Sequence, residues 1–208
     1  KGVSGTAELS IGLMLSVMRK IPQSFSAVKS GIWEVGPFRG NEVAGKTLGV
    51  IGCGRLGSKV SRTAVALGMK VIAYDPFISR VPAGVELKNT QLDLFNEADI
   101  ISIHTPLTNV TKNMITKDVL LDMKKDAIII NTARGGIINE QDLYEVMKSG
   151  HLSGAAIDVF EKEPYNGKLT EIERCLLTAH MGSMSNDCRT KMEIEATEEV
   201  VLFLMGKE

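Results

Sequence analysis

Three glycines, Gly52, Gly54 and Gly57, punctuate the segment GCGRLG (residues 52–57), which follows the apolar run Leu48–Ile51 and precedes a helix-length segment. The first glycine allows a tight turn, the second lets a pyrophosphate approach the backbone, and the third lets the helix pack closely on a sheet. The helix N-terminus adds free N–H groups and the positive end of its dipole. The spacing therefore predicts a loop that binds the pyrophosphate of a dinucleotide.

Asp75 follows the next apolar run, Val71–Tyr74, and precedes Pro76 and Phe77. At the end of the second strand of such a fold, a carboxylate can accept hydrogen bonds from both ribose hydroxyls of NAD, and it would repel the 2′-phosphate of NADP. The competing interpretation is an ordinary turn residue before a proline. With the glycine loop in register, the sequence favours NAD as the cofactor.

Polar residues also follow later apolar runs. His104, Thr105 and Pro106 come directly after Ile100–Ile103, where contact with a cofactor and a structural turn are both open interpretations. Arg134 comes shortly after the next apolar run. Its planar guanidinium could bind a carboxylate with two hydrogen bonds or polarise a carbonyl, and the alternative is a surface arginine in a glycine turn.

Acidic residues and a histidine end the series. Asp158, Glu161 and Glu163 lie in or just after the apolar run at residues 155–159, and His180 follows the last apolar run. A histidine beside a carboxylate can donate a proton to a carbonyl near neutral pH, whereas a histidine alone is more often structural. The spacing predicts an acid/base pair but does not choose between the two glutamates.

These residues need elements that bring them together. Short apolar runs alternate with helix-length segments, which is typical of a parallel sheet covered by helices. We therefore expect an α/β domain, a Rossmann-type doubly wound parallel sheet with helices on both faces, whose ligand lies at the carboxyl ends of the strands. The expected strands are Thr47–Ile51, Lys70–Tyr74, Ile100–Ile103, Ala127–Ile130, Ala155–Val159 and Cys175–Thr178. The expected helices between them are Leu56–Leu67, Gln91–Phe95, Thr116–Met123 and Asn139–Lys148, with Asn139 as the N-cap of the last.

One NAD-binding domain, residues 1–208, is expected in three parts. A leading amphipathic helix occupies residues 1–30, from about Ser4 to Ser30, and Pro22 kinks or divides it. A glycine-containing loop then leads to the Rossmann core at residues 46–184. A closing helix, from Ser185 to about Met205, lies in the last part, residues 185–208.

The composition excludes several classes of protein. A formal net charge of −1 over 208 residues gives no reason to expect nucleic acid as a partner. No apolar stretch approaches the roughly 18 residues that a membrane span needs, so we expect no membrane partner. The three cysteines, Cys53, Cys175 and Cys188, are odd in number and lack CxxC spacing. We therefore expect no disulfide framework, no metal site and a cytoplasmic location.

Taken in order, the motifs resemble those of the D-isomer-specific 2-hydroxyacid dehydrogenases over essentially the whole chain. The matching segments are AEL at residues 7–9, GKTLG at 45–49, the glycine loop, HTP at 104–106, NTARGG at 131–136, GAAIDVF at 154–160, Glu163-Pro164 and His180. The resemblance implies hydride transfer between NAD(H) and a D-2-hydroxy acid or 2-oxo acid, as in phosphoglycerate dehydrogenases.

The resemblance also implies a role for each site residue. Arg134 would bind the substrate carboxylate, His180 would be the acid/base, and Glu163 would be its partner rather than Glu161. The related formate dehydrogenases carry glutamine in place of this glutamate, so glutamate points to a hydroxy acid or keto acid. The remaining cofactor-binding positions would be Arg55, Leu56, Thr132, Ala133, Gly182 and Asp158, the last in contact with the nicotinamide carboxamide.

Members of this family have a second, substrate domain, which we expect to be absent from this sequence. We therefore expect the isolated chain to bind NAD with little turnover. The resemblance implies homodimers that form partly through the first helix, although a helix facing the core explains its apolar stripe equally well. The alternative function is that of a non-enzymatic NAD(H)-sensing protein, like the C-terminal binding co-repressors that are similar to the same family.

Overall fold

The computed structural model describes residues 3–206, and within them it contains one seven-stranded sheet with parallel pairing throughout. The strands are β1 (Thr47–Ile51), β2 (Lys70–Tyr74), β3 (Val85–Leu87), β4 (Ile100–Ile103), β5 (Ile128–Asn131), β6 (Gly154–Ile157) and β7 (Cys175–Leu177). Their order across the sheet is β3-β2-β1-β4-β5-β6-β7. The strand order thus reverses between the neighbouring parallel strands β1 and β4, and ligands of such sheets bind in the crevice at that point. The predicted doubly wound fold is confirmed.

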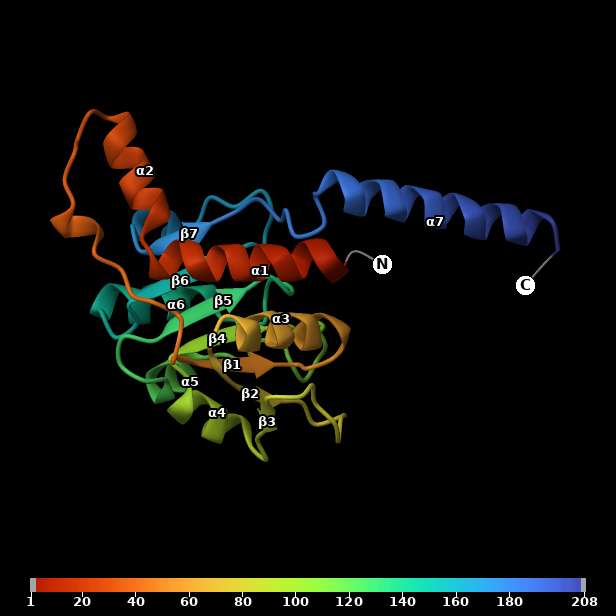
Figure 1. Ribbon diagram of the computed structural model, residues 1–208, viewed down its shortest axis with the longest axis horizontal. Coiled ribbons are helices and arrows are strands. Elements are labelled where there is room, and N and C mark those ends of the chain that lie inside the picture. The colour runs from red at the N-terminus through yellow and green to blue at the C-terminus, as the bar shows by residue number, and fades with distance from the viewer. Residues whose placement is uncertain (1–2, 207–208) are drawn as a thin grey trace.

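Helices cover both faces of the sheet (Figure 1). One face carries α1 (Val3–Met18) and α3 (Arg55–Ala66). The other carries α4 (Gln91–Glu97), α5 (Lys117–Asp122) and α6 (Glu140–Ser149). Residues of β1, β4, β5 and β6 are buried along the whole length of each strand, because both faces of the sheet are covered.

Polar side chains cap the N-termini of α4 and α6. Asn139 caps α6, as predicted, by accepting a hydrogen bond from the Asp142 N–H at 3.0 Å. Thr90 caps α4 in the same way through the Asp93 N–H. Such caps satisfy N–H groups that have no partner within the helix.

The leading segment is two helices rather than one. Residue Lys20 adopts a left-handed φ of 52°, and α2 (Ile21–Lys29) begins directly after it with Pro22 in its first turn. Proline fits there because its missing N–H would have no helical partner. A short 3-10 helix, η1 (Gly36–Phe38), lies in the loop that returns to β1.

Two short elements within residues 46–184 were not predicted from the sequence. Strand β3 extends the edge of the sheet, and the 3-10 helix η2 (Lys168–Glu171) precedes β7. In β3 only three residues pair, and none of them is fully buried. A segment this short and exposed has no apolar run that would mark it as a strand.

The apolar stripe of α1 belongs to the core of this chain. Ala7, Met14 and Met18 are buried against residues of the sheet and of α3. Packing within the chain therefore accounts for these three positions of the stripe. By contrast, Phe25 on α2 and Trp33 in the following loop are exposed.

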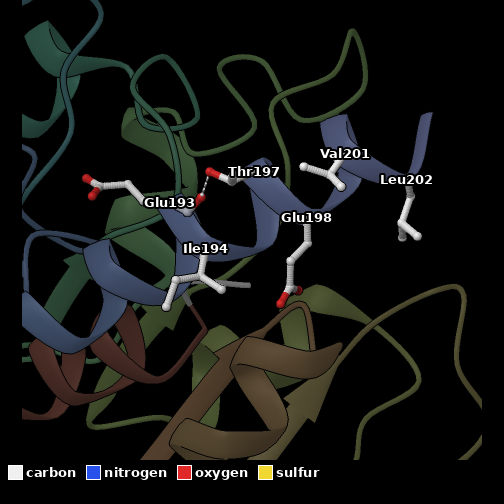
Figure 2. Close-up of a pocket in the computed structure, with 6 residues that line it drawn as sticks. All are labelled: Glu193, Ile194, Thr197, Glu198, Val201 and Leu202. Atoms are coloured by element: carbon white, nitrogen blue, oxygen red, sulfur yellow. Dashed lines mark hydrogen bonds between the residues drawn. The ribbon is translucent and has the colours of Figure 1, made fainter. Parts of the chain in front are cut away.

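The last helix, α7 (Asn186–Leu204), projects from the body of the molecule (Figure 1). Its N-cap is Ser185, whose side chain accepts a hydrogen bond from the Cys188 N–H. Figure 2 shows apolar and acidic side chains, such as Ile194 and Glu198, along the exposed part of this helix. Among residues 3–206, no helix is long and apolar enough to cross a membrane.

Candidate active site

Five of the predicted site residues gather at the carboxyl edge of the sheet. Gly52, Asp75, His104, Thr132 and Asp158 directly follow β1, β2, β4, β5 and β6. A cleft of about 460 Å³ lies at this edge. It is lined by Thr6, Leu56, His104, Thr105, Pro106, Thr132, Ala133, Arg134, Asp158, His180, Gly182, Ser183 and Met192.

The glycine loop is closely packed on one side and open on the other. A Cβ atom on Gly52 would lie 2.9 Å from the carbonyl oxygen of His104, and one on Gly57 would lie 2.0 Å from the carbonyl oxygen of Gly52. Around Gly54, in contrast, no atom would lie within 4 Å of an added Cβ. Because α3 begins at the next residue, this open backbone and the helix N-terminus fit a pyrophosphate.

Asp75 ties the glycine loop to the end of β2. Its Oδ2 accepts a hydrogen bond from the Cys53 N–H at 3.0 Å, and its Oδ1 accepts one from the Phe77 N–H at 3.0 Å. Asp75 therefore shapes the turn before Pro76. Since a carboxylate oxygen can accept more than one hydrogen bond, both oxygens can also accept from ribose hydroxyls.

Buried polar atoms border the cleft after β4. The ring of His104 is enclosed, its Nε2 lies 2.9 Å from Ser102 Oγ, and burial lowers the pKa of His104 to about 4. The ring is therefore neutral at pH 7. His104 Nδ1 and Thr105 Oγ1 are buried without a hydrogen-bond partner among the described residues. Such atoms are costly unless a ligand or water satisfies them, so this wall fits a polar ligand.

Glu163 and His180 form a pair at the rim of the cleft. His180 Nδ1 lies 2.8 Å from Oε2 and 3.1 Å from Oε1 of Glu163. The hydrogen bond from His180 lowers the pKa of the Glu163 carboxyl, and the Phe160 N–H, which donates to Oε1 at 3.1 Å, adds to this. The backbone N–H of Glu161 instead donates a hydrogen bond to Oε1 of Glu140. The two glutamates left open by spacing thus differ in position.

Asp158 holds the segment that carries His180. The carboxylate is buried, and its Oδ1 accepts hydrogen bonds from Thr178 Oγ1 at 2.7 Å and the Met181 N–H at 2.9 Å. Its Oδ2 accepts from the Gly182 N–H at 3.1 Å, and its carbonyl oxygen accepts from the His180 N–H at 2.8 Å. The arrangement fixes the backbone on both sides of the histidine, a role that the sequence did not suggest.

Arg134 lies at the turn after β5 and is exposed to solvent beside the cleft. One of its guanidinium nitrogens donates to the carbonyl oxygen of Ala133 at 2.6 Å, and its own carbonyl oxygen accepts from Asn131 Nδ2 at 3.0 Å. A Cβ atom on Gly135 would lie 1.9 Å from the carbonyl oxygen of Phe160. This close contact holds the arginine turn against the segment that leads to Glu163.

The predicted residues fall into two groups. Most of them line the cleft itself, while Gly52, Gly54, Arg55, Gly57, Asp75 and Glu163 lie outside its lining. Glu163 is joined to the cleft by its contact with His180, and Asp75 contacts the glycine loop, of which Leu56 lines the cleft. Thr6 on α1 and Met192 on α7 also line the cleft but were not predicted. They come from helices rather than strand ends, so the strand-end rule could not find them.

The fold and this cleft define a dinucleotide-binding domain with a histidine–glutamate pair at the rim of the cleft. Residues 11–182 match the family described as D-isomer specific 2-hydroxyacid dehydrogenase, NAD binding domain. The chain therefore belongs to this family, and its cofactor is NAD.

Relatives with known names support this assignment. D-3-phosphoglycerate dehydrogenase of Methanocaldococcus jannaschii is 42% identical over 205 residues, which are 97% of this chain and 39% of that protein. Hydroxypyruvate reductase of Thermotoga maritima is 41% identical over 199 residues, which are 93% of this chain and 64% of that protein. The chain thus spans well under half of the first relative and just under two thirds of the second.

A solved structure shares the fold closely. NAD-dependent formate dehydrogenase from Staphylococcus aureus, in complex with NAD, superposes with a TM-score of 0.93 at 27% identity. The match covers all of this chain, 100%, and 63% of the other chain. The names of all three proteins are those of dehydrogenases or reductases, and none of them supports the NAD-sensing alternative.

Proposed function

We propose that this chain is the NAD-binding part of an enzyme that reversibly transfers a hydride between NAD(H) and a D-2-hydroxy acid or 2-oxo acid. The observation that carries the proposal is the pair of His180 and Glu163, 2.8 Å apart, at the rim of the cleft that Arg134 also lines. An acid/base pair is needed when a carbonyl oxygen gains or loses a proton during the reaction. When bound, NAD supplies or accepts a hydride at C4 of its nicotinamide ring.

Each of the three residues has a distinct task. Arg134 binds the carboxylate of the substrate through its planar fork and orients the neighbouring carbonyl. Protonated His180 donates its proton from Nε2 to the carbonyl oxygen during reduction and takes it back during oxidation. Glu163 accepts the hydrogen bond from Nδ1, so it orients the ring and stabilises the imidazolium form.

The remaining residues bind the cofactor in order along the edge of the sheet. The glycine loop binds the pyrophosphate, and Asp75 binds the adenine-side ribose. Asp158 keeps acceptor capacity on Oδ2 for the nicotinamide carboxamide beside the bond from Gly182. The full proposed set is Gly52, Gly54, Arg55, Leu56, Gly57, Asp75, His104, Thr105, Pro106, Thr132, Ala133, Asp158 and Gly182.

We propose that residues 1–208 form a single NAD-binding domain, with its Rossmann core at residues 46–184 and its closing helix at residues 185–208. In the longer enzyme, a substrate domain would close the other side of the cleft and exclude water from it. The names of the relatives, which act on D-3-phosphoglycerate and hydroxypyruvate, suggest a small 2-hydroxy or 2-oxo acid as the substrate.

We also propose a homodimer and a cytoplasmic location. Apolar side chains on α2 and the following loop are exposed to solvent, among them Phe25 and Trp33 at 66% and 82% of their surface. A second copy of the chain could cover them. The proposed location is supported by Cys53, Cys175 and Cys188, which are free and buried, as suits a reducing compartment.

Binding and turnover experiments test the proposal together. Calorimetric titration of this chain should show NADH binding at least roughly tenfold tighter than NADPH, because Asp75 repels the 2′-phosphate. With hydroxypyruvate added, the chain alone should oxidise little NADH.

In the full-length enzyme, His180→Ala should lower turnover by roughly 10² to 10⁴-fold and leave NADH affinity unchanged. Equal affinity for NADPH, or normal turnover of the variant, would contradict the proposal.

A further inference from the structure

Ser10 is a buried polar residue within the apolar stripe of α1. Only 2% of its surface is exposed, and its Oγ lies 2.7 Å from Thr132 Oγ1 and 2.7 Å from the carbonyl oxygen of Thr6. Thr132 is itself buried, lines the cleft, and lies two residues before Arg134. Buried hydroxyl groups are costly unless they are hydrogen-bonded, so this contact joins α1 specifically to the end of β5.

The chemistry of the three oxygen atoms fixes the direction of the hydrogen bonds. The carbonyl oxygen of Thr6 can only accept, so the single hydroxyl proton of Ser10 is donated to it. Ser10 Oγ then accepts the single hydroxyl proton of Thr132. Thr132 Oγ1 is left with acceptor lone pairs alone, and those are what it offers to a ligand in the cleft.

The place of Thr132 in the sheet indicates which half of the cofactor it meets. Strand β5 lies between β4 and β6, so Thr132 lies between His104 and Asp158 at the carboxyl edge. It belongs to the same short turn as Arg134 rather than to the glycine loop. If the proposed function holds, Thr132 therefore faces the nicotinamide half of NAD. That half offers hydrogen-bond donors in its carboxamide –NH₂ and its ribose hydroxyls.

We propose that Ser10 is a positioning residue that makes Thr132 an acceptor-only group, and that Thr132 thereby selects a hydrogen-bond donor on the nicotinamide half of the cofactor. The inference rests on the proposed function. Without Ser10, the proton of Thr132 loses its partner inside the protein and turns toward the cleft. Two donors then face each other, and the bound cofactor is destabilised.

A double-mutant cycle tests this coupling. We expect Ser10→Ala and Thr132→Val each to weaken NADH binding by roughly 5–10-fold, about the worth of one hydrogen bond. The double variant should bind no more weakly than Thr132→Val alone, because Ser10 acts only through that hydroxyl. Thr132→Ser keeps the hydroxyl and should restore NADH affinity that Thr132→Val loses.

A cofactor analogue distinguishes the two donors. The reduced acetylpyridine analogue of NADH carries an acetyl group in place of the carboxamide and therefore lacks its N–H donors. If the carboxamide is the donor, the affinity of the analogue should not change in Ser10→Ala or Thr132→Val. If a ribose hydroxyl is the donor, it should fall by the same factor as that of NADH. Both results support the acceptor-only assignment.

Controls separate this role from a structural one. Ser16→Ala removes a half-buried hydroxyl from the same helix and should leave NADH affinity unchanged. Thermal unfolding of every variant establishes that each one is folded at the temperature of the titration. The inference is overturned if Ser10→Ala binds NADH as tightly as the unmodified chain, or if the effects of the two substitutions simply add. Failure of the unmodified chain to bind NADH would refute the proposed function instead.

Discussion

His180 has a left-handed backbone, with φ at 51°, a conformation that is uncommon for a residue with a side chain. Such a residue persists only when its surroundings fix it, at a cost of roughly 1–3 kcal/mol. Asp158 supplies the compensation, since its carbonyl oxygen binds the His180 N–H and its carboxylate binds both Met181 and Gly182. The resemblance gave Asp158 a role toward the cofactor, and the geometry adds the task of placing the histidine.

At the same scale, His104 should make the stability of the chain depend on pH. Burial lowers its pKa to about 4 in the folded chain, while its ordinary value is 6.5. Between these values the unfolded chain binds more protons, so the free energy of unfolding falls as the pH is lowered. From pH 7 to pH 5 we expect this group to contribute a loss of roughly 1–2 kcal/mol.

Urea unfolding of the chain and of His104→Gln at both pH values measures this loss. Glutamine can keep a hydrogen bond to Ser102 but does not titrate, so its stability should fall less on acidification. The carboxylates of the protein titrate alike in both chains and cancel in the comparison. Parallel loss of stability in the two proteins would show that His104 already titrates normally in the folded state.

At the scale of elements, the junction of β1 and α3 depends on two glycines with different tasks. Gly57→Ala should destabilise the chain by about 1–3 kcal/mol, because its Cβ would lie 2.0 Å from the carbonyl oxygen of Gly52 and force α3 away from the sheet. Gly54→Ala meets no atom within 4 Å and should leave stability nearly unchanged. It should nevertheless weaken NADH binding, since the new methyl group occupies the space proposed for the pyrophosphate.

Urea unfolding and NADH titration of both variants separate these tasks. Gly12→Ala is the matched control, because Gly12 lies in α1 and an added Cβ there also meets no atom within 4 Å. It should leave NADH binding unchanged and stabilise the helix by up to about 1 kcal/mol. If Gly54→Ala bound NADH normally, the loop would not be the pyrophosphate site.

The sequence predicted the strands that carry at least three apolar residues. The predicted bounds of β1, β2 and β4 agree with the structure residue for residue, and those of β5 and β6 differ by one or two residues. Strand β3 was missed because three partly exposed residues give no periodic signal. The division of the leading helix was signalled by Pro22, although only the structure places the break at Lys20.

The candidate site was predictable only where it lies at strand ends. A parallel sheet brings all these ends to one edge, so Asp75, Arg134 and His180 could be grouped from sequence order alone. Ser10 and Thr6 could not be grouped with them. The periodicity of α1 shows which face is buried but not which polar atom that face meets across the core, because such contacts are set by tertiary packing.

At the scale of the whole molecule, two elements lie outside the packed body. Helix α7 extends from it with apolar side chains such as Ile194, Val201 and Leu202 exposed (Figure 2). Most helical stability in proteins comes from packing of one face, and α7 has little such packing on the described residues. This matches the proposal that a further domain of a longer enzyme adjoins the chain at this end of the cleft, which Met192 of α7 already lines.

Helix α2 and the loop after it are the second such element, and they carry the prediction of a homodimer. Light scattering should give the chain twice its mass of 22.5 kDa. Joint substitution of Phe25→Glu and Trp33→Glu places charges on the exposed apolar surface and should yield monomers, since burying unpaired charges is costly. Phe77→Glu is the matched control, because Phe77 is 94% exposed but follows β2 at the cofactor edge, and it should remain a dimer. A monomeric unmodified chain, or equal dissociation by Phe77→Glu, would remove α2 from the interface.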